Sequence, residues 1–120
     1  MVKKKLKPIL PSLREKKRYL VFEVISKKQI DDVSAIYDAV HSSAIELLGN
    51  LDTSKAGIMF LKDKYNQNLQ RGLIRVNNRY VDHLRSALLM IEKINNDDVI
   101  FRSVGVSGIL NKAEKKYLAS

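Results

Sequence analysis

The sequence has no cysteine among its 120 residues. A chain without cysteine cannot form disulfides, bind zinc through thiolates or use a thiol nucleophile. It also has no run approaching the roughly 20 consecutive apolar residues that a membrane-spanning helix needs. Its lysine-rich start lacks the apolar segment of a signal peptide. We therefore expect a cytoplasmic protein with no membrane partner.

Motifs that carry catalysis or metal binding are missing from the sequence as well. It has no glycine-rich phosphate loop and no nucleophile elbow, and its two histidines, His41 and His83, fall on different predicted helices. A histidine without a second ligand nearby is more often structural than metal-binding. Ser107 lies between Val106 and Gly108 without the partners of a catalytic triad. We predict no catalytic residue, no metal site and no cofactor bound by this chain.

The sequence does have a large excess of positive charge. It carries 22 Lys and Arg against 13 acidic residues, a net charge of +9. Residues 1–28 hold ten Lys or Arg and two Glu, whereas residues 29–52 hold five acidic side chains and no Lys or Arg. A basic surface gains free energy by displacing the counterions of phosphates, so we expect a polyanionic partner. The acidic segment is expected to face away from nucleic acid or toward a basic protein.

The spacing of apolar residues predicts a single α+β domain over residues 1–120, because 45% of the residues are hydrophobic and the chain is long enough to bury a core. Strands are predicted at residues 18–25, 56–62, 71–76 and 99–106, and helices at 29–48 and 80–94. The order βαββαβ is typical of ferredoxin-like and RNA-recognition sandwiches. We expect a basic flexible arm at residues 1–10, this core at 11–110, and a helical tail at 111–120. A short helical turn is predicted at residues 11–17.

Residues with capping preferences predict where the two helices begin and end. Ser26 and Gln29 have the spacing of a capping box, and Gly49 suits a helix C-cap. Residues 95–97, Asn-Asn-Asp, are predicted to stop the second helix. The first strand is apolar on both of its faces, so the sheet face opposite the helices must be covered. The tail from residue 111 and a partner protein are both candidates for that cover.

Basic side chains on and near the predicted sheet indicate how an RNA would be bound. The third strand lacks the aromatic residues with which RNA-recognition domains stack bases. Arg71 and Arg75 lie four residues apart and so on one face, which suits the phosphates of a folded RNA. The alternative is an exposed sheet edge kept soluble by charge. Ser107 and Gly108 are included among the predicted RNA-binding residues because they would allow the RNA to approach the protein backbone closely. The full set is Arg14, Lys16, Lys17, Arg18, Arg71, Arg75, Arg79, Arg102, Ser107 and Gly108.

Four segments together resemble the ribonuclease P protein component 2 family, the small protein subunit of archaeal and eukaryotic ribonuclease P. They are the opening PSLREKKRYL at residues 11–20, RV at 75–76, VDHLRSAL at 81–88 and VGVSGIL at 104–110. The likeness covers nearly the whole chain in the same order. The sequence departs from the family pattern at Asn96, where a glycine is expected, and at Phe101, where a branched aliphatic residue is common.

The resemblance implies a noncatalytic subunit of the endoribonuclease holoenzyme that removes 5′ leaders from precursor tRNA. In that family the protein binds and stabilises the catalytic domain of the ribonuclease P RNA, which itself holds the catalytic Mg²⁺. The resemblance further implies pairing with ribonuclease P protein component 3 in a two-plus-two heterotetramer, and only indirect contact with precursor tRNA. The alternatives are a protein-interaction module and a stand-alone RNA-processing enzyme on a ferredoxin-like scaffold.

Overall fold

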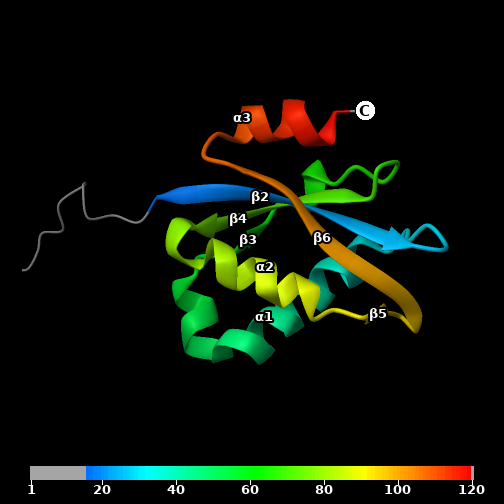
Figure 1. Cartoon of the computed structure of the whole chain (residues 1–120), viewed down its shortest axis with the longest axis horizontal. Coiled ribbons are helices and arrows are strands. Elements are labelled where there is room, and N and C mark those ends of the chain that lie inside the picture. Colours follow the sequence, from blue (N-terminus) through cyan, green and yellow to red (C-terminus); the bar gives the residue numbers. More distant parts are fainter. Residues whose placement is uncertain (1–15, 120) are drawn as a thin grey trace, which may run out of the picture.

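The computed structural model of the protein describes residues 16–119 and contains one five-stranded sheet in the order β3-β4-β2-β6-β5. Every paired strand is antiparallel to its neighbour. Helices α1 and α2 lie on one face of the sheet and α3 lies on the other (Figure 1). This is the predicted βαββαβ sandwich, so the predicted fold class is confirmed. The expected arm at residues 1–10 and Arg14 fall outside the described residues.

The centre of the sheet is β2 (Lys17–Ser26), which pairs with β4 (Arg71–Asn77) on one side and β6 (Asp97–Ser107) on the other. Both long neighbours are rich in the β-branched residues that favour strands. The sheet ends in two short strands, β3 (Met59–Phe60) next to β4 and β5 (Lys93–Ile94) next to β6. The second predicted strand, 56–62, was too long, because Ala56 still caps a helix and a 3₁₀ turn begins at Lys62.

Helix α1 (Val33–Lys55) begins later and ends later than predicted. The carboxylate of Asp32 caps its start by accepting a hydrogen bond from the Ala35 amide at 3.1 Å, so the predicted capping box at Ser26 is wrong. Gly49 has φ 80° and ψ 168°, a non-helical conformation that divides α1 at a kink, so a first helical segment ends at the predicted glycine and a second segment continues to Lys55. Glycine accepts this left-handed φ at little cost, and the helix resumes to its end.

Helix α2 (Val81–Leu89) is shorter than the predicted helix over residues 80–94. Asn95 and Asn96 both have positive φ, 50° and 71°, and form the two-residue turn between β5 and β6. This turn type requires left-handed backbone at both positions, which Asn tolerates. The prediction that residues 95–97 stop the second helix is therefore wrong, because the asparagines close a hairpin and the helix has already ended at Leu89.

Two apolar clusters lie on the two faces of the sheet. The larger one packs alternate residues of β2, such as Leu20 and Phe22, against α1 and α2. The smaller one packs Val21 and Leu73 against Ala113 and Leu118 of the C-terminal helix. We use that name for α3 (Leu110–Ala113) and the π-helical turn that continues it over Glu114–Leu118. The tail therefore covers the second face of the sheet, as one of the two predicted candidates required.

Candidate nucleic-acid interface

Six of the predicted RNA-binding residues meet at one end of the sheet. The antiparallel register places the start of β2 beside the end of β4 and the end of β6, with Lys17 opposite Asn77 and Tyr19 opposite Ser107. The Asn78 amide also donates to the Lys16 carbonyl at 2.7 Å, which fixes the chain just before β2. We call this group the strand-end cluster, and its members are Lys16, Lys17, Arg18, Arg79, Ser107 and Gly108.

Asn77 is the buried polar residue that holds the base of the strand-end cluster together. Only 6% of its surface is exposed. Its side-chain oxygen accepts a hydrogen bond from the Lys17 ammonium, and its Nδ2 donates to the Lys55 carbonyl at 2.8 Å. Its backbone amide donates to the Ala56 carbonyl at 2.9 Å. One amide side chain thus joins β2, β4 and the end of α1. The sequence alone did not distinguish this role from that of an ordinary turn residue.

Arg18, Ser107 and Gly108 come close together where β2 begins and β6 ends. The Arg18 Nη1 donates to the Lys17 carbonyl at 3.0 Å, and a Cβ added at Gly108 would lie 3.5 Å from the same nitrogen. The Ser107 hydroxyl accepts a hydrogen bond from the Ile109 amide at 3.1 Å, which forms the turn into the C-terminal helix. The glycine leaves the backbone accessible next to a guanidinium, an arrangement suited to a phosphate.

Arg75 and Arg79 extend the positive charge from this end in two directions. Arg79 is exposed in the 3₁₀ turn Asn78–Tyr80 that leads from β4 into α2. Arg75 lies on the sheet face of the C-terminal helix, directly opposite Tyr19 on β2. Its Nη1 lies 3.8 Å from the Met59 sulfur, and its buried Nε has no hydrogen-bond partner within residues 16–119.

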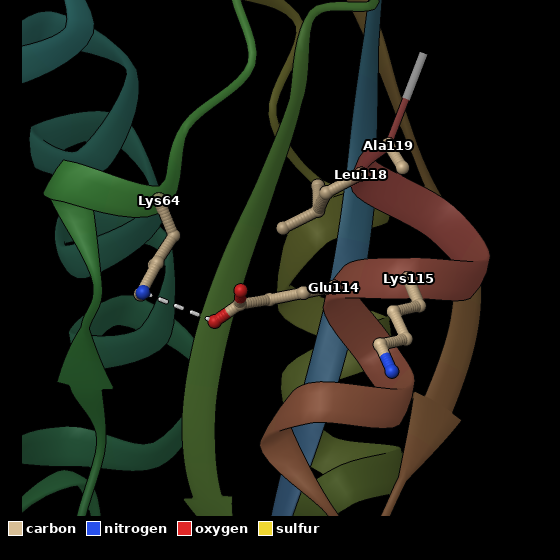
Figure 2. Close-up of a pocket in the computed structure, with 5 residues that line it drawn as sticks. All are labelled: Lys64, Glu114, Lys115, Leu118 and Ala119. Atoms are coloured by element: carbon tan, nitrogen blue, oxygen red, sulfur yellow. Dashed lines mark ion pairs between the residues drawn. The ribbon is translucent and has the colours of Figure 1, made fainter.

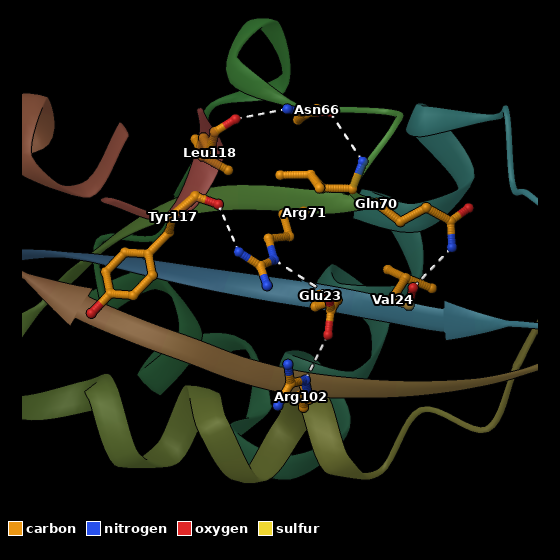
Figure 3. A network of polar contacts seen from close by, with 9 residues as sticks. Glu23, Val24, Asn66, Gln70, Arg71, Arg102, Tyr117 and Leu118 are labelled. Carbon is orange, nitrogen blue, oxygen red and sulfur yellow. Dashed lines mark hydrogen bonds and ion pairs between the residues drawn. The ribbon is translucent and has the colours of Figure 1, made fainter. Parts of the chain in front are cut away.

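Arg71 and Arg102 lie farther along the same sheet face and share one carboxylate, that of Glu23 (Figure 3). The Arg71 Nε donates to Glu23 Oε2 at 3.2 Å, and the Arg102 Nε donates to Oε1 at 2.6 Å. Burial by itself raises the pKa of Glu23, but the hydrogen bonds and charges of Arg102 and Arg71 outweigh it and hold the pKa below its ordinary value. These two arginines are therefore separate from the strand-end cluster, and each is partly occupied within the protein.

Arg71 also anchors the C-terminal helix. Its Nη1 donates to the Tyr117 carbonyl at 3.0 Å, and Asn66 Nδ2 donates to the Leu118 carbonyl at 2.7 Å (Figure 3). At the side of the helix, Lys64 forms an ion pair with Glu114 at 3.1 Å (Figure 2). The two hydrogen bonds to the Tyr117 and Leu118 carbonyls satisfy groups that a helix end leaves free. They position the helix over the sheet.

Gly105 on β6 makes room for the ring of Tyr117. A Cβ added at Gly105 would lie 2.1 Å from the Tyr117 Cζ atom, a separation that two carbon atoms cannot adopt. The ring therefore rests directly on the backbone of the strand. A glycine within a strand was the signal for such a close approach, although the sequence did not identify its partner.

The described part of the chain presents cationic and backbone groups that are suited to binding an anion. Within residues 16–119, no group of three or more His, Asp or Glu side chains is placed to hold a metal ion. No helix of the same residues is long and apolar enough to cross a membrane. Tyr65 packs its ring against Phe22 and Tyr37, so it contributes to the core.

Comparisons with known proteins agree on one family. A family model described as the Rpp14/Pop5 family matches residues 18–118. The chain is 36% identical over 118 residues to the ribonuclease P protein component 2 of Thermococcus kodakarensis, covering 98% of this chain and 96% of that protein. It is 37% identical over 113 residues to the component 2 of Methanosarcina mazei, covering 94% and 93%. A chain in the cryo-EM structure of yeast ribonuclease MRP has a TM-score of 0.59 at 14% identity, covering 79% of this chain and 76% of that chain, which supports the fold.

Proposed function

The chain belongs to the Rpp14/Pop5 family, and from this membership we propose that it is a noncatalytic protein subunit of ribonuclease P. It would bind and stabilise the catalytic domain of the RNA that removes 5′ leaders from precursor tRNA. The relatives that carry the component 2 name span nearly the same length as this chain, which supports a shared role for the whole chain. The Mg²⁺ used in catalysis would be held by the RNA and not by the protein.

The observation that carries this proposal is the strand-end cluster. Its side chains come from the starts and ends of three different elements, yet the sheet register and Asn77 bring them to one place. Lys and Arg supply the charge, whereas Gly108 allows the RNA backbone to approach closely. Such a rigid group of cations is suited to the closely spaced phosphates of a folded RNA, which proteins recognise largely by shape and backbone.

The partners follow from the family and from the distribution of charge. We propose that the chain pairs with ribonuclease P protein component 3 in a two-plus-two heterotetramer, acts in the cytoplasm and contacts precursor tRNA only indirectly. Helix α1 carries most of the acidic segment, including Asp38, Glu46 and Asp52, and lies on the sheet face away from the C-terminal helix (Figure 1). An acidic helix suits a protein partner better than RNA.

Two double variants at opposite ends of β2 test the proposal. Lys16→Ala with Arg18→Ala removes two charges from the strand-end cluster, whereas Lys27→Ala with Lys28→Ala removes two exposed charges from the other end. We expect the first pair to weaken binding to ribonuclease P RNA by about tenfold or more and to lower the salt dependence of binding by about two ions. The second pair should leave both quantities nearly unchanged. Equal losses in the two variants would show that charge acts without a defined site.

A further inference from the structure

One row of side chains crosses the sheet next to the strand-end cluster. The strand register places Met59, Arg75, Tyr19 and Ser107 side by side on β3, β4, β2 and β6. The row shares its sheet face with the C-terminal helix, because Tyr19 lies two residues before Val21, which that helix covers. Met59 is 47% exposed, and Tyr19 and Arg75 are half-buried. The row is therefore partly open, in agreement with Figure 1, where β2 begins to the left of the C-terminal helix.

Tyr19 contributes an aromatic ring to this row, and that ring contacts no other ring within residues 16–119. The side chain packs against the smaller apolar cluster, which holds it in place. Tyr37 and Tyr65, by contrast, each contact the ring of Phe22 in the larger cluster. A ring that is held by packing and is still partly exposed offers a surface on which a flat group can stack. Tyr19 is placed to act in this way.

Arg75 has a guanidinium that is bound to no carboxylate within residues 16–119. Its Nη1 lies 3.8 Å from the sulfur of Met59, a weak acceptor, and its buried Nε has no hydrogen-bond partner in the same residues. Because β3 and β2 flank β4 on opposite sides, this contact draws the guanidinium away from Tyr19. Arg71 on the same sheet face is instead bound to Glu23 at 3.2 Å. Arg75 can therefore turn toward an anion without breaking a stronger bond.

Positive charge surrounds the Tyr19 ring. Lys17 precedes it by two residues on the same strand face, and Arg18 approaches Gly108, which follows the residue paired with Tyr19. Arg75 lies across from it on β4. None of the four positions in the row and none of residues 16–19 is acidic. Proteins bind single-stranded nucleic acid through aromatic rings that stack on bases and through Lys and Arg that bind phosphates. A nucleotide would supply both the flat group and the anion that fit this surface.

We propose that Tyr19 stacks on one unpaired base of the RNA and that Arg75 binds a phosphate beside that base. This inference rests on the proposed function, and it names the part of the RNA that the protein binds at this end of the sheet. The base must be unpaired, because a base inside a helix already stacks on its neighbours. A single base is expected, because the row has one aromatic residue and β4 has none.

Two tyrosine variants separate stacking from packing, with binding measured below the unfolding midpoints of both. Tyr19→Leu keeps an apolar side chain but removes the ring, so affinity for ribonuclease P RNA should fall by about fivefold to a hundredfold. Tyr117→Leu is the matched control, because Tyr117 is also half-buried and packs in the same apolar cluster. It should leave the affinity nearly unchanged, although both variants lower the unfolding midpoint. Equal losses of affinity would overturn the proposal, because Tyr19 would then act only through packing.

The salt dependence of binding distinguishes the two contacts. Tyr19→Leu removes no charge, so the affinity should fall at every salt concentration while the slope against salt stays the same. Arg75→Gln removes one phosphate contact and should lower that slope by about one ion. Tyr19→Phe restores the ring and should return the affinity to within about threefold of that of the unaltered protein. A slope that changes in Tyr19→Leu, or no rescue by Tyr19→Phe, would contradict stacking.

Ultraviolet crosslinking of the unaltered protein to ribonuclease P RNA gives a test that does not depend on how a variant folds. Mass spectrometry should locate a crosslinked nucleotide on Tyr19, and crosslinks at other residues without one at Tyr19 would overturn the proposal. If Lys16→Ala with Arg18→Ala weakens binding and Tyr19→Leu does not, this inference fails and the proposed function stands. If neither weakens binding, both fail. A Tyr19→Leu protein that binds RNA normally but incorporates the other protein subunits poorly would assign the ring to a protein partner.

Discussion

Glu23 is the residue on which the second sheet face depends. It is the shared acceptor for Arg71 and Arg102, and Arg71 in turn holds the Tyr117 carbonyl. The Glu23 side chain is 19% exposed, so its carboxylate is partly shielded from water. A charged hydrogen bond in such a place contributes more than a surface ion pair. One carboxylate therefore connects the central strand to the C-terminal helix.

Replacing this carboxylate should destabilise the fold in a pH-dependent way. We expect Glu23→Gln to lower the free energy of unfolding at pH 7 by about 2 kcal/mol, because two guanidiniums lose their shared counter-charge. The pKa of Glu23 lies below its ordinary value of 4.5, so its stabilisation is complete above pH 4.5 and is lost as the pH falls through the lower folded pKa. Urea unfolding at pH 7, 4.5 and 3 measures this. Glu46→Gln, at an exposed carboxylate of α1, is the control and should change stability by less than about 0.5 kcal/mol.

Gly105 and Gly108 lie close together in the sequence, but replacing each with alanine should affect stability differently. Gly105→Ala places a Cβ 2.1 Å from the Tyr117 ring and should lower stability by about 1–3 kcal/mol as the ring moves away. Gly108→Ala places a Cβ next to the Arg18 guanidinium only, with Nη1 at 3.5 Å and Cζ at 3.8 Å, both ordinary contacts, and should change stability little. Thermal unfolding of both variants makes the comparison. Similar midpoints would mean that Tyr117 does not rest on β6.

At the scale of elements, the two helices differ from the prediction at their ends and not in their identity. The apolar stripe identified α1, but Asp32 caps it in place of Ser26, and Gly49 introduces a kink. Ser26 instead donates to the Lys28 carbonyl at 2.5 Å, within the turn that leaves β2. Both residues have side chains that suit a cap, so local preference alone could not choose between them.

Substitutions of the two competing cap residues distinguish the observed helix start from the predicted one. Asp32→Ala should lower the free energy of unfolding by about 1 kcal/mol, because the Ala35 amide loses its acceptor. Ser26→Ala should have a smaller effect, since it removes contacts of a turn and not of a helix. Denaturant unfolding of both variants gives the two values. A larger loss for Ser26→Ala would place the start of the helix where the sequence predicted it.

The molecule as a whole separates its charges and its apolar surfaces. Cations gather in the strand-end cluster, acids gather on α1, and the exposed side chains of Ile25 and Ile100 lie near the other end of β2. Such a separation would allow the proposed RNA-binding end to act while other surfaces contact proteins. The C-terminal helix rigidifies the sheet between these surfaces through Arg71, Asn66 and Lys64.

Binding of the whole chain to ribonuclease P RNA should depend strongly on salt. If about six to ten basic groups contact phosphates, the affinity should fall by on the order of a thousandfold or more between 50 and 200 mM salt. The reason is the release of condensed counterions, which loses its driving force as the salt concentration rises. Binding measured by filter retention across this range gives the slope. A flat response would contradict phosphate recognition.

The order of the elements and the sign of the charge could both be predicted from the amino-acid sequence. Both are local properties: strands and helices follow from periods of 2 and 3.6, and the excess of Lys and Arg follows from composition. The family pattern has a glycine at residue 96, which indicates a backbone with positive φ at that position. Asn96 does have a φ of 71°.

Which cations share a site could not be predicted without the folded structure. Arg71 and Arg75 have the same spacing pattern, yet Arg71 is held by Glu23 and the Tyr117 carbonyl, whereas Arg75 lies opposite Tyr19 with its Nε unpaired in residues 16–119. Cross-strand register brings together residues that are distant in the chain, such as Lys17 and Asn77. Side-chain periodicity predicts which face of the sheet a residue occupies but not which residue lies next to it on the neighbouring strand. That neighbour determines whether a charged side chain forms an ion pair within the protein or remains available to a partner.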